Sequence, residues 1–428
     1  MLAAAAVAAL TALVVAPAPS YDPWAWLLWG REIAGGTLST AEGPAFKPLP
    51  VGVCALLSVL GSAAPVAWVL VARTGAVLAV WLGFLLGRRL GGGSTAAGVV
   101  AAAGVALCGD FAGYAAAGAE TGWTIALALA AVEAWRVERY RAALACGLAC
   151  ALLRVEAWPF LLTAGIVLWR RRPQDRPLLA ACAVAVPALW LVPELIGSGD
   201  LLRSGTRARM PNPGQPATAA VPAWAALREA AALPLWPLWA GAVACLALPA
   251  ARVARPVLAA GLAWIALVAI MAQAGFSGEP RYSLPGGALV AIAGAIGLVA
   301  LARDRRAAAV LACALLLVAA APKLVDLPDI RRDQAWQRGL ASDLSSVIRV
   351  AGGRNALLAC GRPYVGNLRG PLLAYHLEVV KRRVAFVPRP PGAVFRSRLS
   401  PTAATEPPTG PGFTPLARSG RWEIRVAC

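Results

Sequence analysis

The segment from Ser20 to Glu32 follows the first apolar stretch of the chain and contains residue types that could carry chemistry. It begins Ser-Tyr-Asp-Pro and includes three tryptophans. Asp22 before Pro23 is typical of a helix start, with proline at the first helical position, and tryptophans gather at membrane interfaces. A carboxylate at a membrane boundary can also accept a proton as a general base. Asp22 is therefore predicted either to cap a helix or to act as a catalytic base.

Residue counts exclude two common kinds of active site. The chain has one histidine, His376, so a two-histidine metal motif is impossible and a Ser-His-Asp triad would have to use this residue. Neither Gly-Lys-Ser nor Gly-Lys-Thr occurs, so there is no Walker-A phosphate loop. No resident cofactor is predicted, and no motif supports a divalent metal.

The composition places most of the chain in a membrane. Of 428 residues, 59% are apolar and 14% are charged, and the mean hydropathy is +0.66, whereas soluble domains average about 45–50% apolar and about 25% charged residues. A bilayer span needs about 20 mostly apolar residues. The sequence predicts about eleven spans in an all-α polytopic domain, at 2–16, 70–87, 94–112, 120–135, 142–153, 157–169, 177–195, 232–250, 256–274, 285–302 and 307–322.

The charges indicate how these spans are oriented. The net charge is +19, which by itself could suggest a nucleic-acid partner. However, the loops assigned to the inside hold fourteen arginines and four acidic residues, Asp304 among them, and the outside up to residue 322 holds nine basic and ten acidic residues. This asymmetry is the positive-inside pattern. It argues against nucleic acid and predicts a plasma (inner) membrane protein whose first span, Met1 to Ala16, is retained.

Two domains are predicted. Residues 1–322 form the transmembrane domain, with outer loops at 17–69 and 196–231, and residues 323–428 form a small α/β domain outside the membrane. The outer loop contains an interfacial helix at 49–60, which is too short to span. In the tail, helices are expected at 331–350 and 364–379, strands at Ala356–Cys360, Val384–Val387 and Trp422–Cys428, and a loop at 388–412.

Cys360 and Cys428 are predicted to form a disulfide. The other seven cysteines lie in apolar stretches, and disulfides persist outside the cytoplasm. Both residues end predicted strands, and neighbouring strands lie close enough for a bridge. The alternative is two independent thiols.

The order of motifs outside the membrane is similar to a known superfamily. After the acidic residue come Phe46-Lys47-Pro48-Leu49-Pro50, an interfacial helix, Arg73 and a span that ends in Gly-Arg-Arg. Gly118-Ala119-Glu120-Thr121, Arg154-Val155-Glu156-Ala157 and Glu279-Pro280-Arg281-Tyr282-Ser283-Leu284-Pro285 follow in the same order as in that superfamily. The chain thus resembles the GT-C membrane glycosyltransferases, including protein-mannosyltransferase-like, aminoarabinose-transferase-like and arabinofuranosyltransferase-like members. It departs from their pattern in having Asp22 alone in place of an acidic pair, and Val155 in place of a proline.

The resemblance implies an inverting glycosyltransferase that uses a polyprenyl-phosphate sugar. Nucleotide sugars are made in the cytoplasm, so an outward-facing transferase needs a lipid-anchored donor. Asp22 would be the general base, and the acceptor would be a glycan, a lipid or a protein outside the membrane. Guanidinium and ammonium groups bind phosphate. Substrate contacts are therefore expected from Lys47, Arg73, Glu120, Arg154, Glu156, Arg281 and Tyr282, and from a lid at 197–209 that includes Asp200 and Arg203.

Other interpretations stay open. Arg154 with Glu156, and Glu279 with Arg281, could simply neutralise one another, because charges within a membrane tend to pair. Glu120 could brace a helix, and the 197–209 loop could be a solvated connector. A transporter or a flippase of lipid-linked intermediates is the main competing function, although no paired half-chain repeat is visible. A noncatalytic envelope scaffold is the third.

Overall fold

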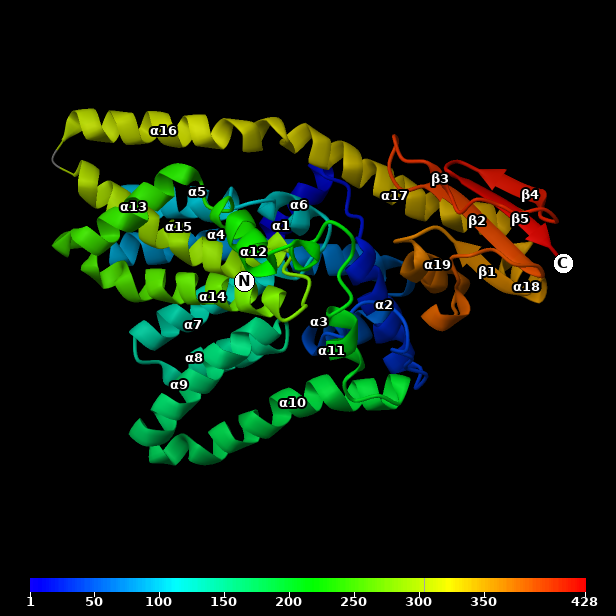
Figure 1. Cartoon of the computed structure of the whole chain (residues 1–428), viewed down its shortest axis with the longest axis horizontal. Helices are drawn as coiled ribbons and strands as arrows, with labels where there is room; N and C mark the ends of the chain where they lie inside the picture. The colour runs from blue at the N-terminus through cyan, green and yellow to red at the C-terminus, as the bar shows by residue number, and fades with distance from the viewer. Residues whose placement is uncertain (304) are drawn as a thin grey trace.

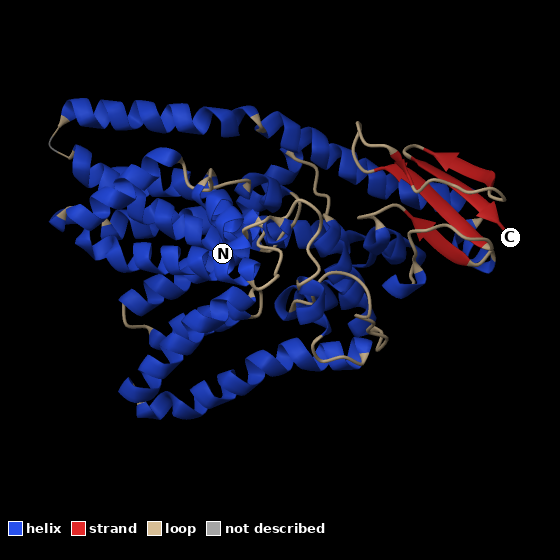
Figure 2. Ribbon diagram, viewed as in Figure 1, coloured by secondary structure: helices blue, strands red, loops and turns tan. Residues whose placement is uncertain are grey.

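The structure is a computed structural model that describes residues 1–303 and 305–428, so Asp304 lies outside the described residues. Most of the chain is helical, with a small sheet at one end (Figures 1 and 2). The α-helices are α1 (Leu2–Val14), α2 (Tyr21–Ala34), α3 (Pro48–Leu57), α4 (Ala64–Leu90), α5 (Thr95–Ala106), α6 (Phe111–Ala116), α7 (Thr121–Arg136), α8 (Tyr140–Ala151), α9 (Trp158–Arg171), α10 (Arg176–Ser198), α11 (Arg203–Ala208), α12 (Pro222–Ala231), α13 (Trp236–Ala247), α14 (Arg255–Gln273), α15 (Pro280–Ala302), α16 (Arg306–Val325), α17 (Leu327–Val350), α18 (Gly353–Ala359) and α19 (Gly370–Leu377).

Each predicted span overlaps a helix of the structure. Five helical segments among the described residues are long and apolar enough to cross a bilayer, and the pair α12 and α13, bent by 95°, gives a sixth if it is one broken span. Others are short: α5 and α8 have 12 residues each, which at 1.5 Å per residue is less than the hydrocarbon thickness of about 30 Å. The chain is an integral membrane protein, and the number of eleven crossings stays a prediction.

The arginine-rich turns lie at one end of the helical bundle. The α7–α8 and α9–α10 turns, the last turn of α15 and the first turn of α16 are at the end opposite the sheet (Figure 1). Arg89 and Arg136 pair there with Glu133, and Arg141 and Arg172 pair with Asp175. This arrangement agrees with the charge asymmetry of the sequence, because the inside loops and the tail domain occupy opposite ends.

The first outer loop folds into two helices, α2 and α3. Asp22 lies in the first turn of α2, and Lys47 directly precedes α3. Pro23 and Pro48 lie in the first turns of these helices, where a missing N–H costs nothing. The helices touch at Gly30, where a Cβ atom would lie 2.5 Å from the carbonyl carbon of Cys54. Only glycine permits this approach. The predicted interfacial helix at 49–60 corresponds to α3.

The tail carries a mixed sheet of β1 (Arg362–Val365), β2 (Gly392–Arg398), β3 (Thr405–Glu406), β4 (Thr414–Ser419) and β5 (Trp422–Ala427). The order is β1-β2-β5-β4, with β3 beside β2. The β1–β2 pair is parallel and the others are antiparallel, with Val394 opposite Arg425 in the β2–β5 pair. Residues alternate between faces of β2: Phe395 packs toward α17 and α19, and Val394 packs against Phe413 on the other face.

Several expectations for the tail were wrong. Residues 356–359 belong to helix α18 and not to a strand, with Cys360 directly after the helix, and Val384–Val387 forms only an isolated bridge at Ala385. The segment 388–412, expected to be a loop, contains β2 and β3, and the expected helix at 364–379 is shortened to α19 by strand β1. The helix at 331–350 and the strand at the C-terminus were predicted correctly.

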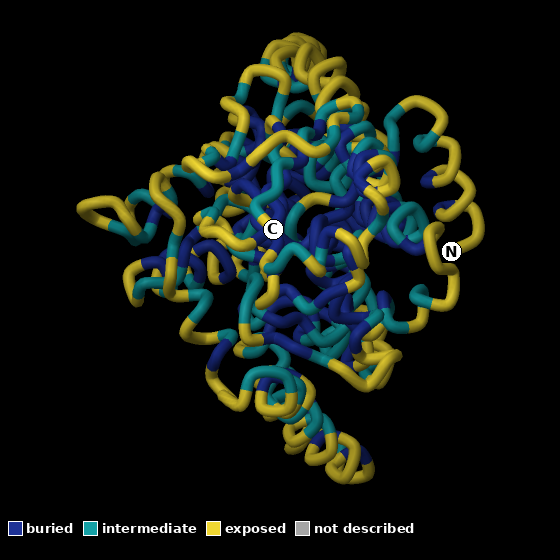
Figure 3. Tube along the Cα trace, turned by 90° about the vertical axis from the view of Figure 1, so that its right-hand side faces the viewer, coloured by how far each residue is buried: buried dark blue, intermediate teal, exposed yellow. Residues whose placement is uncertain are grey.

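The tail and the first outer loop share one hydrophobic core. Trp24, Leu27 and Leu28 of α2 belong to the same cluster of buried side chains as Leu373 of α19 and Phe395 of β2. Seen from the sheet end, buried segments gather at the centre of the molecule and exposed ones cover the periphery (Figure 3). Burial of apolar side chains therefore fixes the tail against the loop that carries Asp22.

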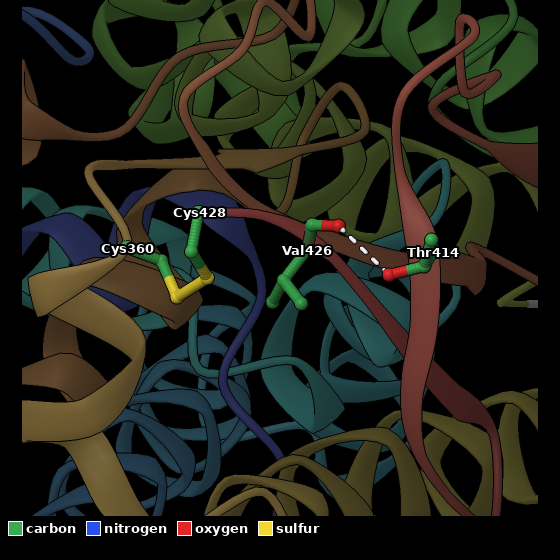
Figure 4. Close-up of a disulfide and its surroundings, with 4 residues drawn as sticks. All are labelled: Cys360, Thr414, Val426 and Cys428. Carbon is green, nitrogen blue, oxygen red and sulfur yellow. Dashed lines mark hydrogen bonds between the residues drawn. A yellow bond between two sulfur atoms is a disulfide. The ribbon is translucent and has the colours of Figure 1, made fainter.

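Cys360 and Cys428 form a disulfide with their Cα atoms 4.5 Å apart (Figure 4). Cys360 follows helix α18, and Cys428 follows strand β5, so only one end has the strand context that the sequence predicted. Beside the bridge, the hydroxyl of Thr414 donates to the carbonyl oxygen of Val426 (3.3 Å). The disulfide ties the last strand to the helix that precedes the first.

Glu32 is a buried carboxylate in α2. Its side chain is 5% exposed, Oε2 accepts the backbone N–H of Ser39 (2.9 Å), and Oε1 has no hydrogen-bond partner among the described residues. Burial raises the pKa of Glu32 from 4.5 to about 7. A raised folded-state pKa stabilises the fold below the unfolded pKa, and that contribution is lost as the pH rises through the folded pKa.

Replacing Glu32 with glutamine should therefore stabilise the protein in a pH-dependent way. Relative to the unchanged protein, Glu32→Gln is expected to gain up to about 3 kcal/mol of unfolding free energy between pH 5 and pH 8. Thermal unfolding in detergent across this range measures the difference. The exposed Glu138, changed to glutamine, is the control and should give no trend with pH. A difference that does not depend on pH would show that Glu32 is already ionised at pH 5.

Candidate active site

A cavity of about 970 Å³ lies where the membrane domain, the outer loops and the tail meet. Asp22, in the first turn of α2, and Lys47, directly before α3, line the cavity. The segment after α8 contributes Arg154 and Glu156. The other walls come from α10, from the 201–215 segment, from 276–282 before and within α15, and from the tail. The size suits a substrate larger than a single sugar.

Asp22 and Arg281 meet in this cavity. Nη1 of Arg281 donates to Oδ2 of Asp22 (3.0 Å), and the same guanidinium contacts Glu279 and the hydroxyl of Tyr282 (3.3 Å). The ring of Tyr282 also lies 3.7 Å from the guanidinium carbon of Arg154. Asp22 and Arg281 are 259 residues apart in sequence. The contact therefore needs α2 and α15 to reach the same depth.

A second charge cluster forms the wall beneath. Glu120 contacts Lys47, and its Oε1 also lies 3.5 Å from Nη1 of Arg154. Arg154 forms a two-point contact with Glu156, in which Nε donates to Oε2 (3.0 Å). All four residues are buried. The expected pairing of Arg154 with Glu156 is present, and Glu120 braces the two cations from behind the cavity surface, because it is not among the lining residues.

The 197–209 segment is held against the first outer loop. Arg203 donates to the carbonyl oxygens of Pro44 (2.6 Å) and Gly43 (2.9 Å), and it lies 3.5 Å from Glu194 of α10. Arg203 is 9% exposed and does not line the cavity. Arg203 therefore lies away from the cavity: its donors are used by carbonyl oxygens, and it anchors the segment.

Asp200 and Arg73, also predicted to contact a substrate, do not line the cavity. Asp200 is exposed, and its Oδ1 accepts the backbone N–H of Leu202 (2.8 Å), so it stabilises a turn outside the cavity. Arg73 is buried in α4, where it donates to the carbonyl oxygens of Val15 (2.9 Å), Ala16 (3.2 Å) and Ala116 (3.1 Å). These carbonyls follow α1 and end α6, so Arg73 satisfies helix ends and not a phosphate.

Two other parts of the cavity were not among the predicted substrate contacts, although Arg207 lies within the predicted lid at 197–209. Arg207 of α11 lines the cavity, and the only side-chain hydrogen bond of Arg207 among the described residues goes to the carbonyl oxygen of Met210 (2.8 Å). The tail contributes Asn367, Leu368 and Phe386. Leu368 has φ +64°, a left-handed conformation that costs a leucine about 1–3 kcal/mol. The position of Arg207 and of these tail residues at the cavity depends on tertiary packing, which leaves no periodic pattern in the sequence.

The strained turn is held by Arg369, which is 2% exposed. Its guanidinium donates to the carbonyl oxygen (2.7 Å) and hydroxyl (3.0 Å) of Ser397 and to Glu406 (2.8 Å). Burial lowers the pKa of Arg369 from its usual value. These contacts fix Leu368 at the cavity wall.

The predicted site residues thus divide into three groups. Asp22, Lys47, Arg154, Glu156, Arg281 and Tyr282 line one cavity, Glu120 supports it, and Arg73, Asp200 and Arg203 lie elsewhere. Across the described residues, no group of three or more His, Cys, Asp or Glu side chains is arranged to hold a metal ion.

Comparisons with known proteins show the fold. No protein-family model matches the chain, and no curated protein does. ArnT from Cupriavidus metallidurans in the apo state matches with a TM-score of 0.52 at 14% identity, over 97% of this chain and 94% of that chain. ArnT bound to undecaprenyl phosphate matches with a TM-score of 0.48 at 15% identity, over 100% and 97%. At 14% identity, the similarity to ArnT in the apo state shows a shared fold.

The expected fold is therefore confirmed. The chain has the fold of ArnT, a GT-C glycosyltransferase, as an all-α membrane domain with a small C-terminal sheet. The resemblance read from scattered motifs at positions 22 to 285 agrees with this result.

Glu120 tests the charge cluster. Glu120→Gln would leave Lys47 and Arg154 buried with one carboxylate between them, and breaking a buried pair costs about 3–5 kcal/mol. We expect a marked fall in the thermal midpoint in detergent. Glu133→Gln is the matched control, because its partners Arg89 and Arg136 are exposed, and exposed pairs contribute about 0–1 kcal/mol. Equal losses in the two variants would contradict the proposed bracing role.

Proposed function

We propose that this protein is a glycosyltransferase that moves a sugar from a polyprenyl-phosphate donor to an acceptor outside the membrane. The observation that carries the proposal is the meeting of Asp22 and Arg281 in a large cavity at the outer end of an ArnT-like fold. ArnT, whose apo fold this chain shares, has been crystallised bound to undecaprenyl phosphate. A lipid-anchored donor also fits the topology, because the cavity borders the membrane helices.

Asp22 acts as the general base in this proposal. Its Oδ2 is held by Arg281, which leaves Oδ1 to accept the hydrogen of an acceptor hydroxyl. The acceptor oxygen attacks the anomeric carbon while the bond from that carbon to the phosphate oxygen breaks. The acceptor proton passes to Asp22, polyprenyl phosphate leaves, and the configuration at the anomeric carbon inverts.

The cations of the cavity have different roles. Arg154 and Arg281 already contact two carboxylates each, so they orient Glu156 and Asp22. Among the described residues, Glu120 is the one carboxylate partner of Lys47, whose ammonium nitrogen also lies 5.2 Å from the centre of the Trp26 ring, and an ammonium group has three donors. Arg207 has no carboxylate partner among the described residues. Lys47 and Arg207 therefore have N–H groups left to bind the phosphate of the lipid-linked sugar. Fixed positive charge at that phosphate stabilises the leaving group.

The proposal places the cavity and the tail on the extracytoplasmic side of the plasma membrane. Its basis is the position of the arginine-rich turns at the far end of the bundle, together with the positive-inside rule. The cavity walls determine the specificity for the sugar and for the acceptor. The tail supplies one of these walls through Asn367, Leu368 and Phe386.

Asp22→Asn is the first test. Purified protein is incubated with a panel of polyprenyl-phosphate sugars and an envelope extract as acceptor, and release of polyprenyl phosphate is measured. Loss of a general base lowers rates by about 10²- to 10⁴-fold, so we expect a loss in this range with the thermal midpoint nearly unchanged. Asp200→Asn, at the exposed turn outside the cavity, should keep full activity. Retained turnover in a folded Asp22→Asn protein would refute the assignment of the base.

Arg207→Gln tests the phosphate contact. Losing one charge-assisted hydrogen bond costs about 1.5–3 kcal/mol, so the KM for the lipid donor should rise about 10- to 100-fold, with a smaller change in kcat. Arg209→Gln is the matched control, because Arg209 lies over the ring of Phe276 (4.9 Å) and does not line the cavity. If both variants raise the KM equally, the effect comes from the overall charge of the segment and not from a phosphate contact.

A further inference from the structure

A second cavity of about 430 Å³ lies beside the first, between the tail and the first outer loop. The tail contributes Arg362 and Tyr364 of β1 and the 384–389 segment, which includes Arg389. The outer loop contributes Glu42. Phe386 borders both cavities. The two cavities therefore share this one lining residue.

The second cavity carries positive charge that the protein does not neutralise. Arg362 donates to the carbonyl oxygens of Arg382 (2.9 Å) and Arg383 (3.3 Å), which are uncharged partners. Arg389 has no side-chain hydrogen bond or ion pair among the described residues. The lining carboxylate, Glu42, is already paired with Lys381 (2.9 Å). Arg362 and Arg389 thus line a cavity whose one acidic lining residue, Glu42, is already neutralised by Lys381.

Contacts between the tail and the outer loop hold this cavity in shape. Lys381 is 2% exposed and joins Glu42 to the tail, and its ammonium nitrogen lies 4.6 Å from the centre of the Phe386 ring. Arg362 lies on β1, which pairs in parallel with β2. Its guanidinium is fixed by the two carbonyls before any ligand arrives. A fixed, planar set of donors is what phosphate and carboxylate groups bind best.

We propose that the second cavity is an acceptor subsite that binds an anionic group, phosphate or carboxylate, of a glycan acceptor. This inference rests on the proposed transferase function. The reacting hydroxyl lies near Asp22, the acceptor chain passes Phe386, and a negatively charged group one or two sugars away meets Arg362 and Arg389. The lining comes from the tail and an outer loop, not from membrane helices, which favours a glycan over a lipid headgroup.

Binding without turnover tests this subsite. The full-length protein in detergent is titrated with fluorescent dextran oligosaccharides of one length, in phosphorylated, carboxymethylated and uncharged forms. The anionic forms should bind at least tenfold more tightly than the uncharged form. R362Q/R389Q should lose at least tenfold in affinity for the anionic forms, and R389Q alone, which breaks no contact among the described residues, should lose several-fold.

The matched control is R349Q/R418Q, which removes two exposed arginines of the tail whose side chains have no partner among the described residues and should change affinity by less than twofold. Equal losses in the two double variants, or none in R362Q/R389Q and R389Q, would overturn the proposal. Competition by short-chain phosphatidylglycerol as strong as by phosphorylated dextran would also overturn it in favour of a lipid headgroup. A protein that releases polyprenyl phosphate but binds charged and uncharged dextran alike would contradict the subsite and leave the transferase proposal intact.

Discussion

Charged side chains buried near a membrane must meet opposite charges, and this constraint organises the outer end of the molecule. Lys47, Glu120, Arg154 and Glu156 come from segments before α3, at the start of α7 and after α8, yet they form one buried cluster. An unpaired member would carry a large desolvation penalty. The cluster therefore sets these segments at one depth, and the cavity floor follows from that alignment.

Pairing also decides which cations remain for a substrate. Arg281 is held between Asp22 and Glu279, so its main effect is to orient the carboxylate. In the proposed mechanism, Lys47 and Arg207, which line the cavity, supply the hydrogen bonds to the phosphate. The wall formed by 201–215 is steadied by Arg203 and Glu194. The remaining wall depends on apolar burial, because the tail and α2 share a core that fixes Phe386 and Leu368 near Asp22.

The sequence predicted the membrane helices well because long apolar runs and loop charges are governed by local composition. It predicted the tail less well. The run Ala356–Cys360 is short and apolar, so its spacing cannot separate a strand from a helix, and the structure makes it part of α18. Strand β2 was missed because Pro390, Pro391 and Gly392 suggest a loop, while its strand character depends on pairing with β1 and β5.

Among the candidate site residues, the pairs Arg154–Glu156 and Asp22–Arg281 line the cavity. Arg73 shows why others failed: an arginine beside a membrane can bind phosphate or close helix ends, and the choice depends on carbonyls more than forty residues away in sequence. Arg207 belongs to the predicted lid at 197–209 but was not singled out there, because Arg203 and Arg209 lie in the same segment. Its proposed role in binding phosphate depends on its having no carboxylate within reach, and only the folded chain determines that.

Photolabelling with a polyprenyl phosphate that carries a diazirine next to the phosphate tests the central claim most directly. The account predicts that labelled peptides come from the cavity walls, at 201–215 and 276–282, and that both unlabelled polyprenyl phosphate and the Arg207→Gln change reduce the labelling. Labelling confined to the outer surfaces of α10 and α16, and insensitive to competition, would contradict the account.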